Sequence, residues 1–527
     1  MIQRRTLLQH GAVACVAASL PSCLAEQNKG HLEGPYFKTS NKRWQAAYDK
    51  ALAILAGNVQ TLPRFDGPVL IEGSNYAGIW QECGPHESLI YRRFRPDVAR
   101  NSHMTFFALQ RPDGQLPANN KRTEAGYGQI QMVVPIAATA WELASATGDD
   151  ALLREAYRAC SAWDAWLTRY RNTRGTGLIE GFCTYDTGHD NSPRWNGIPA
   201  QCPDKDAKRY PPIPTLPRLC PDLSATVYGG RKALASMATA LGKNDEAERW
   251  NDIAEQIRKL ILTRLYVAED AAFYDLDAQD RFVRVRGDVL TRVCGEHVVD
   301  QPLFDELWTW QLRNKNAFWP AYPLPSIAMD DPSFVRPIPR NSWGGASQAL
   351  TALRAPRWFD HYGRAAELTY LMDRWCEAIQ RDMTFRQQLD PLDGQFTQED
   401  LPNYSPTALV MMEFTWRLIG VCPMGHELWW NVRPGHPAAA NANFRIQTDS
   451  GRVASIQYSG SGVALKIDGK LIATVDSGVA RLVTNLDGRA LALLGVSEEP
   501  QEVRLKMNGR ASILQLKPNQ HVLLQAL

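Results

Sequence analysis

The chain has 527 residues, of which 44% are hydrophobic and 22% are charged, and its formal net charge is +2. This length predicts two or three domains, and the composition is rich enough for a large core, which excludes a disordered chain. The charge is near balance and no block of Lys and Arg occurs, which argues against a nucleic-acid-binding protein. The 16 tryptophans suit either a core or platforms on which sugar rings stack.

The first 25 residues predict an export signal. Residues 3–9 approximate a twin-arginine pattern, and an apolar stretch over residues 11–20 follows. This stretch is too short for a permanent membrane span, and no later segment has ~20 apolar residues in a row. Two endings stay open: an imperfect lipobox would make Cys23 a lipid-anchored first residue, whereas cleavage after Ala25 would release a soluble protein. We expect a periplasmic or extracellular protein.

Cysteines after the signal could form disulfides in an oxidising compartment. Cys202 and Cys220 bracket a Pro-rich loop that a bridge would close, and buried free thiols are the alternative. Neither a CxxC pair nor His-rich spacing suggests zinc, so we expect no metal, and the chemistry proposed below requires no organic cofactor. The eight cysteines are Cys83, Cys160, Cys183, Cys202, Cys220, Cys294, Cys376 and Cys422.

Apolar residues recur at helical spacing from about residue 42 to residue 421. Turns at residues 148–150 and 242–245 join neighbouring helices into hairpins. A helical solenoid would show a fixed repeat of ~34–45 residues, and none is found. We therefore expect a mainly α fold, a toroid of α/α hairpins over residues 35–425, whose loops gather around a cleft. The expected helices are 41–56, 128–147, 151–171, 223–241, 246–265, 347–353, 359–381 and 406–419.

Short alternating segments separated by Asp-Gly and Asn-Gly turns follow the helices. They predict a small antiparallel β-sandwich over residues 436–527. Few aromatic residues occur there, so a structural cap on the helices is favoured over a sugar-binding module. The expected strands are 453–458, 463–467, 471–475, 480–484, 490–495, 502–507 and 512–516.

The segment 188–195, Gly-His-Asp-Asn-Ser-Pro-Arg-Trp, is the candidate site loop. Pro193 stops a helix and Gly188 permits a sharp turn, so the loop can project Asp190 into a cavity. A carboxyl group there can protonate a leaving oxygen, Arg194 can hold sugar hydroxyls, and Trp195 can stack on a pyranose. The alternative is an Asx-type turn with a surface salt bridge.

Three further side chains have both a functional and a structural interpretation. Trp343 precedes two glycines that allow a backbone to approach a ligand closely, although a buried helix-start tryptophan explains it almost as well. Glu82 is a candidate carboxylate, with surface charge as the alternative. His189 either bonds to substrate or orients the loop.

Several motifs occur in a fixed order: residues 183–194, Asp222-Leu223-Ser224-Ala225, Trp319-Pro320, Leu324-Pro325-Ser326 and residues 341–345. In this order they resemble the (α/α)6 glycosidases, which include trehalases, processing α-glucosidases and mannosylglycerate hydrolases. The resemblance covers most of residues 76–419. It implies an (α/α)6 toroid that hydrolyses a glycosidic bond, α-linked, of an oligosaccharide or glycoside, with inversion.

The resemblance also implies roles for individual residues. Asp190 matches the general acid and Arg194 a substrate-binding arginine. Asp222 matches an acidic residue that contacts sugar hydroxyls, although an N-cap for the helix from Leu223 would also account for it. The remaining candidate substrate-binding residues are Trp195, Trp319, Trp343 and Gln387.

The general base departs from the family pattern. The family places a glutamate just before a D/N-P-x-x-G turn, but here Gln387 or Gln388 occupies that place, and an amide cannot take up a proton at neutral pH. Three explanations stay open. In the first, the base has moved to Glu399, our first choice, or to Asp390, Asp400 or Glu82. In the second, phosphate attacks the sugar directly and no base is needed. In the third, the protein binds carbohydrate without cleaving it.

Overall fold

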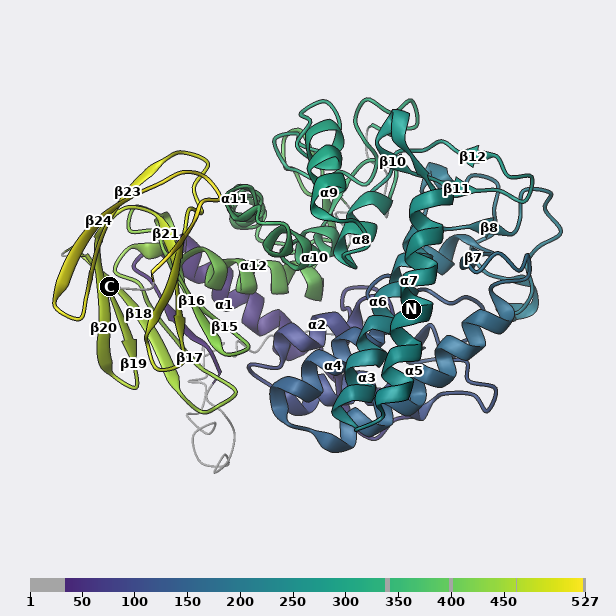
Figure 1. Cartoon of the computed structure of the whole chain (residues 1–527), viewed down its shortest axis with the longest axis horizontal. Coiled ribbons are helices and arrows are strands. Elements are labelled where there is room, and N and C mark those ends of the chain that lie inside the picture. Colours follow the sequence, from purple (N-terminus) through teal and green to yellow (C-terminus); the bar gives the residue numbers. More distant parts are fainter. Residues whose placement is uncertain (1–33, 337–341, 398–400, 461, 525–527) are drawn as a thin grey trace, which may run out of the picture.

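The computed structural model describes residues 34–336, 342–397, 401–460 and 462–524. The predicted export signal with Cys23, and the predicted base Glu399, lie outside these residues. Within the described ranges, none of the helices has both the length and the apolar character that crossing a membrane requires. Helices dominate up to Ile419, and long antiparallel strands follow (Figure 1).

The helical part of the described chain contains twelve α-helices, linked by long connections. They are α1 (Lys42–Gly57), α2 (Gly84–Tyr91), α3 (Pro96–Ala108), α4 (Ile136–Thr147), α5 (Asp150–Tyr170), α6 (Pro221–Ala240), α7 (Asn244–Arg264), α8 (Val289–Gly295), α9 (Gln301–Leu307), α10 (Ala349–His361), α11 (Ala365–Asp382) and α12 (Ser405–Ile419). The two predicted hairpins are helices in contact, α4 with α5 and α6 with α7.

Local signals set several helix ends. The Asn41 side chain accepts a hydrogen bond from the Trp44 N–H at the start of α1, and the Asp149 side chain accepts one from the Leu152 N–H at the start of α5. Gly148 ends α4 in the left-handed conformation, with φ +66°. The predicted turn between α4 and α5 is therefore confirmed.

Two predicted helix boundaries are wrong. Helix α4 begins at Ile136 rather than at residue 128, because residues 128–135 form an irregular connection that ends in Pro135. Helix α10 continues through Pro356 to His361, and the break falls at Gly363, with φ +68°. Buried contacts along α10 outweigh the helix-breaking tendency of proline at this position.

The eleven described strands after α12 form a five-stranded antiparallel sheet and six strands of a second, seven-stranded antiparallel sheet. The strand-rich part begins at Val421, earlier than the predicted residue 436. It also recruits β1 (Tyr36–Lys38), which pairs with β17. The later strands are β15 (Val421–Met424), β16 (Glu427–Val432), β17 (Asn443–Gln447), β18 (Val453–Ser459), β19 (Gly462–Ile467), β20 (Lys470–Ser477), β21 (Ala480–Asn485), β22 (Ala490–Leu494), β23 (Gln501–Met507), β24 (Arg510–Leu516) and β25 (His521–Leu523).

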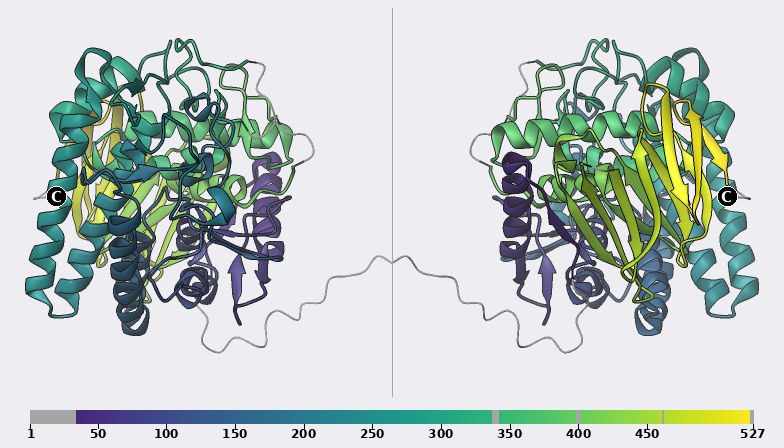
Figure 2. Two further views of the ribbon diagram at one scale, coloured as in Figure 1. Left: turned by 90° about the vertical axis from the view of Figure 1, so that its right-hand side faces the viewer. Right: turned by 90° about the vertical axis from the view of Figure 1, so that its left-hand side faces the viewer.

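The sheets pack on one end of the helical part, beside α1, α11 and α12 (Figures 1 and 2). The Tyr458 hydroxyl bonds to the carbonyls of Ile419 and Asn431 at 2.9 Å each, and the Trp416 and Phe444 rings lie 6.2 Å apart. The connections between α5 and α8 lie on the side of the helical part away from the sheets (Figure 1). These connections contain the candidate acid.

Short strands pair within the helical part and order its connections. Such pairing satisfies backbone groups that irregular loops would otherwise leave without partners. These strands are β2 (Val59–Thr61), β3 (Pro68–Leu70), β4 (Gly78–Trp80), β5 (Asn119–Lys121), β6 (Ala125–Gly126), β7 (Glu180–Gly181), β8 (Arg218–Leu219), β9 (Tyr266–Val267), β10 (Ala272–Phe273), β11 (Asp275–Leu276), β12 (Phe282–Val283), β13 (Ser347–Gln348) and β14 (Gln388–Leu389).

Candidate active site

Asp190 lies between two short 3-10 turns, η1 (Thr184–Thr187) and η2 (Pro193–Trp195). Gly188 ends the first turn with φ +63°, and the Ser192 hydroxyl accepts from the Arg194 N–H at the second. The Asp190 side chain is half-buried. The backbone carbonyl of Asp190 accepts a hydrogen bond of 3.2 Å from the Trp343 N–H. The candidate acid therefore lies on a loop, as predicted, and Trp343 contacts that loop through its backbone.

The Glu82 carboxylate lies against Gly188, two residues before the candidate acid. A Cβ added to Gly188 would overlap the Glu82 Oε2 atom. Glu82 is buried, and burial raises its pKa even though Arg354 and Arg292 act in the opposite direction. The surface-charge interpretation of Glu82 is therefore wrong.

Replacing Gly188 by alanine should disrupt the loop over residues 188–195 that carries Asp190, here called the acid loop. Gly188 and Gly197 both have positive φ, at +63° and +77°, so an alanine at either position costs about 1–2 kcal/mol. Only Gly188 faces a carboxylate, whereas nothing lies within 4 Å of a Cβ at Gly197. We expect Gly188→Ala to lower Tm more than Gly197→Ala does, and to lower any turnover. Equal effects in thermal melts of the two variants would contradict the contact with Glu82.

Arg194 is enclosed by carboxylates rather than open to a ligand. It donates to both oxygens of Asp222 at 2.7 Å and to both oxygens of Asp275 at 2.6 and 2.7 Å, and its side chain is 4% exposed. Burial alone would raise the pKa of Asp222, but Arg194, with Arg292 and His189, lowers it well below its usual value. We therefore assign Arg194 and Asp222 to holding the loop instead of to substrate.

The predicted N-cap role of Asp222 is also wrong. Helix α6 begins at Pro221, so Cys220 is its N-cap residue and makes no side-chain capping bond. Asp222 lies within the first turn of the helix, where its carboxylate accepts from the Leu223 N–H at 3.0 Å. Asp275, on β11, has no signal in the sequence that would link it to Arg194.

A second contact, between His189 and Asp288, holds the loop. The His189 Nε2 lies 2.6 Å from Asp288 Oδ1, and its ring packs on Trp343 with centroids 5.0 Å apart. Burial, then Arg292, lowers the pKa of His189 to about 4, against the effect of Asp288. His189 is thus neutral at pH 7, which favours loop orientation as its role. Arg292 adds a bond to the Thr187 carbonyl at 2.5 Å.

Two predicted stacking tryptophans lie in the core. Trp195 is 2% exposed, and its Nε1 donates to the Thr187 hydroxyl at 2.9 Å. Trp319 is 4% exposed and packs on Trp308 and Phe359. Neither ring presents a face to a sugar, so we assign both to packing. Trp343 is buried too, beside His189 and 5.3 Å from the Arg292 guanidinium, as its structural interpretation predicts. It lies in a turn before α10 rather than at a helix start.

Gln387 lies in a group of aromatic and acidic side chains contributed by distant segments. Its Oε1 accepts a hydrogen bond of 2.9 Å from the Tyr76 hydroxyl. The Tyr76 ring packs on Trp80 and Tyr404, at 5.8 and 5.9 Å between centroids. The Tyr404 hydroxyl in turn donates to the carboxylate of Glu72.

Glu72 is the acidic residue of this group that sequence reasoning missed. Burial, followed by the charges of Glu87 and Glu82, raises its pKa well above the usual value, and Asp190 contributes in the same direction. Asp190 and Glu72 are therefore close enough to interact electrostatically. Glu72 follows a short buried strand, β3, and nothing in its local sequence marks it.

The remaining candidates for the base differ in their surroundings. The Gln388 Oε1 accepts from the Ser342 N–H and from Gln348, so its amide holds the backbone together. Asp390 pairs with Arg336 at 3.1 Å and accepts from the Leu392 N–H. Glu399 and Asp400 lie outside the described residues. Of the described candidates for the base, Glu82 lies against Gly188 of the loop that carries Asp190, and Glu72 interacts electrostatically with Asp190.

A large helical part that carries an acidic loop among buried carboxylates defines a domain of the glycoside hydrolase class. The model of the mannosylglycerate hydrolase MGH1-like glycoside hydrolase domain matches residues 76–416, which is more than half of the chain. The chain belongs to this family. The predicted resemblance to helical glycosidases of the mannosylglycerate hydrolase and trehalase type is thereby confirmed.

Individual relatives are more distant. Mannosylglycerate hydrolase MGH1 of Selaginella moellendorffii is 37% identical over 60 residues, which cover only 11% of this chain and 12% of that protein. A GH63 mannosylglycerate hydrolase from Thermus thermophilus shares 20% identity and a TM-score of 0.57, covering 70% of this chain and 100% of that one. Neutral trehalase from Saccharomyces cerevisiae shares 12% identity and a TM-score of 0.54, and the match covers 69% of this chain and 80% of the trehalase. At such identities the structures establish the fold alone.

Proposed function

We propose that this protein hydrolyses a glycosidic bond, α-linked, with inversion at the anomeric carbon. The observation that carries the proposal is the placement of Asp190. Its side chain is half-buried on a loop fixed by the Trp343 N–H, by the contact of His189 with Asp288 and by the ion pairs of Arg194. Fixing a proton donor in this way supplies the orientation that general acid catalysis needs. The helices would form an (α/α)6 toroid, and the two sheets a β-sandwich that covers one end of it.

In the proposed reaction, Asp190 protonates the oxygen of the leaving group. A water molecule on the opposite face of the sugar attacks the anomeric carbon and gives its proton to a second carboxylate. The two carboxyl groups of inverting enzymes stand ~6.5–9.5 Å apart to leave room for that water. Gln387 can hydrogen-bond a hydroxyl or a water, but its amide cannot accept the proton.

Glu399 remains our proposed base, and Glu72 is the described alternative. Glu399 follows the turn at residues 390–394 closely in sequence. Glu72 is favoured by its electrostatic interaction with Asp190 and by the hydrogen bond from Tyr404, which holds its carboxylate in place. A raised pKa favours a group that must take up a proton near neutral pH.

The substrate class and the location are parts of the same proposal. Mannosylglycerate is the first glycoside to test, because the matching family is named for hydrolysis of it, and α-linked oligosaccharides come next. The twin-arginine-like segment at residues 3–9 supports export to the periplasm or beyond. Either lipid attachment at Cys23 or cleavage after Ala25 would then complete the mature chain.

Product analysis by NMR would test this function. With an α-linked glycoside we expect the β-anomer to appear first, before mutarotation mixes the anomers. Glu399→Gln or Glu72→Gln should lower turnover by ~10²–10⁴-fold, whichever is the base. Glu248→Gln, on the exposed face of α7, is the control and should leave turnover unchanged.

Other outcomes would contradict the proposal. Initial formation of the α-anomer would exclude inversion. Dependence of cleavage on added phosphate, with a sugar phosphate as product, would show phosphorolysis. Binding of the glycosides without turnover under any condition would identify a carbohydrate-binding protein that does not cleave.

A further inference from the structure

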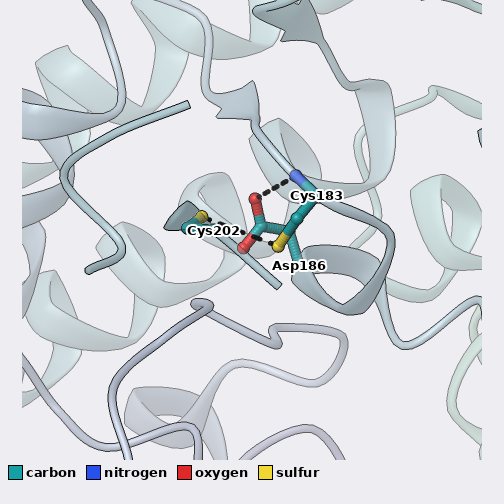
Figure 3. Close-up of side chains that lie close together, drawn as sticks. All are labelled: Cys183, Asp186 and Cys202. Carbon is teal, nitrogen blue, oxygen red and sulfur yellow. Dashed lines mark hydrogen bonds between the residues drawn. The ribbon is translucent and has the colours of Figure 1, made fainter. Parts of the chain in front are cut away.

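Cys183 and Cys202 lie at the two ends of the segment that carries Asp190. Their Sγ atoms are 3.7 Å apart, and both side chains are buried (Figure 3). The backbones beside them are already joined: the Thr184 N–H donates to the Pro199 carbonyl and the Tyr185 N–H to the Ala200 carbonyl, at 3.0 and 3.1 Å. A disulfide would bring the two sulfurs from 3.7 Å to ~2.0 Å apart.

Asp186 lies between the two thiols, but its surroundings do not favour a metal ion. The liganding atoms of Cys183, Asp186 and Cys202 all lie within 4.8 Å of one another. However, both Asp186 oxygens accept from Arg171, at 2.5 and 3.2 Å, and also from the N–H groups of Ile130 and Phe182. The buried Arg171 guanidinium already supplies the positive charge that a metal would bring, and would repel it.

We propose that Cys183 and Cys202 form a disulfide that closes the acid loop. In the reaction, one thiol loses its proton and attacks a disulfide of a small molecule or an oxidoreductase, releasing the first donor thiol. The second protein thiol then attacks the mixed disulfide and releases the other. One protein S–S bond forms, one donor S–S bond breaks, and the two electrons and two protons end on the two donor thiols.

The structure favours this pairing over the one expected from the sequence. The sequence allowed a bridge between Cys202 and Cys220 or free thiols, but the sulfur that the Cys202 Sγ contacts is that of Cys183, and the Arg171 guanidinium also donates to it. The Cys220 thiol instead donates to the Arg218 carbonyl at 3.5 Å. The expected Cys202–Cys220 bridge would have left the residues between Cys183 and Cys202, and with them Asp190, outside the closed loop.

The functional consequence is a constraint on the position of the proton donor. Among the residues other than glycine between Cys183 and Cys202, all of them described, Asn191 alone has a positive φ, at +59°. A covalent link across its base removes loop conformations from the unfolded chain and limits local opening. The effect on catalysis rests on the proposed function, whereas the cross-link itself does not.

The test uses the full chain, purified with a reductant and then exposed to oxidised glutathione. Mass spectrometry after alkylation and digestion without reduction should show a peptide pair joining Cys183 to Cys202. We expect oxidation to raise Tm by about 3–6 °C and to slow proteolysis between the two cysteines. Cys202→Ser and Cys183→Ser should each abolish both effects, and Cys220→Ser should retain them.

Three outcomes would overturn the proposal. The first is a cross-link from Cys202 to Cys220, and the second is that the Cys183 and Cys202 thiols both still react with the alkylating reagent after oxidation of the native protein. The third is that zinc binds and protects these two thiols from alkylation. The main comparison is between oxidised and reduced wild-type protein, so the test remains valid even if a serine variant fails to fold. A cross-link in a protein without turnover would support this inference while contradicting the proposed hydrolysis.

Discussion

Asp190→Asn should lower turnover by ~10²–10⁴-fold while leaving the fold and ligand binding intact. Asparagine has nearly the same size and can keep the hydrogen bond from the Trp343 N–H, which goes to the backbone carbonyl. It cannot protonate a leaving oxygen, and loss of general acid catalysis costs ~10²–10⁴-fold in rate. Steady-state kinetics with the best glycoside found, together with calorimetric binding to the variant, would check both parts.

Asp204→Asn is the matched control for this variant. Asp204 is exposed, lies on the same long connection and pairs with the exposed Arg209 at 2.8 Å. The same chemical change should therefore leave turnover within about twofold, because exposed ion pairs contribute about 0–1 kcal/mol. If Asp190→Asn kept wild-type turnover, the assignment of the proton donor would be wrong.

Arg194→Met should destabilise the protein far more than it weakens any ligand. The change leaves Asp222 and Asp275 buried without their shared cation, and breaking a buried pair in this way costs about 3–5 kcal/mol. We expect Tm to fall by about 5–10 °C, measured by circular dichroism. A substrate-binding arginine would instead raise KM and leave Tm nearly unchanged.

The pH dependence gives a second readout on Arg194. In the wild type, the pKa of Asp222 lies below its unfolded value of about 3.9. The stabilisation from its ionised form is present above pH ~4 and is lost as the pH falls through the folded pKa. The difference in Tm between wild type and Arg194→Met should therefore have its full size at pH 7 and shrink below pH ~4, for example at pH 3. Arg209→Met, which breaks an exposed pair, should show little difference at either pH.

Local signals in the sequence predicted eight of the twelve described helices, seven of the strands after α12 and the loop of Asp190. Helical periodicity, the capping by Asn41 and Asp149 and the turn at Gly148 act within a few residues, so they are visible in the chain itself. The ordered motifs also sufficed to indicate the glycosidase family, because together they cover most of the helical part.

Only the tertiary structure decided which of the candidate side chains are available to a ligand. The sequence cannot distinguish an arginine that holds a sugar from one that holds Asp275, 81 residues away. Burial likewise removed Trp195 and Trp319 from the candidates and brought Glu72 and Cys202 to the neighbourhood of Asp190 and Cys183. These contacts join residues that are distant along the chain, and their energies depend on desolvation, which exists only once the chain has folded.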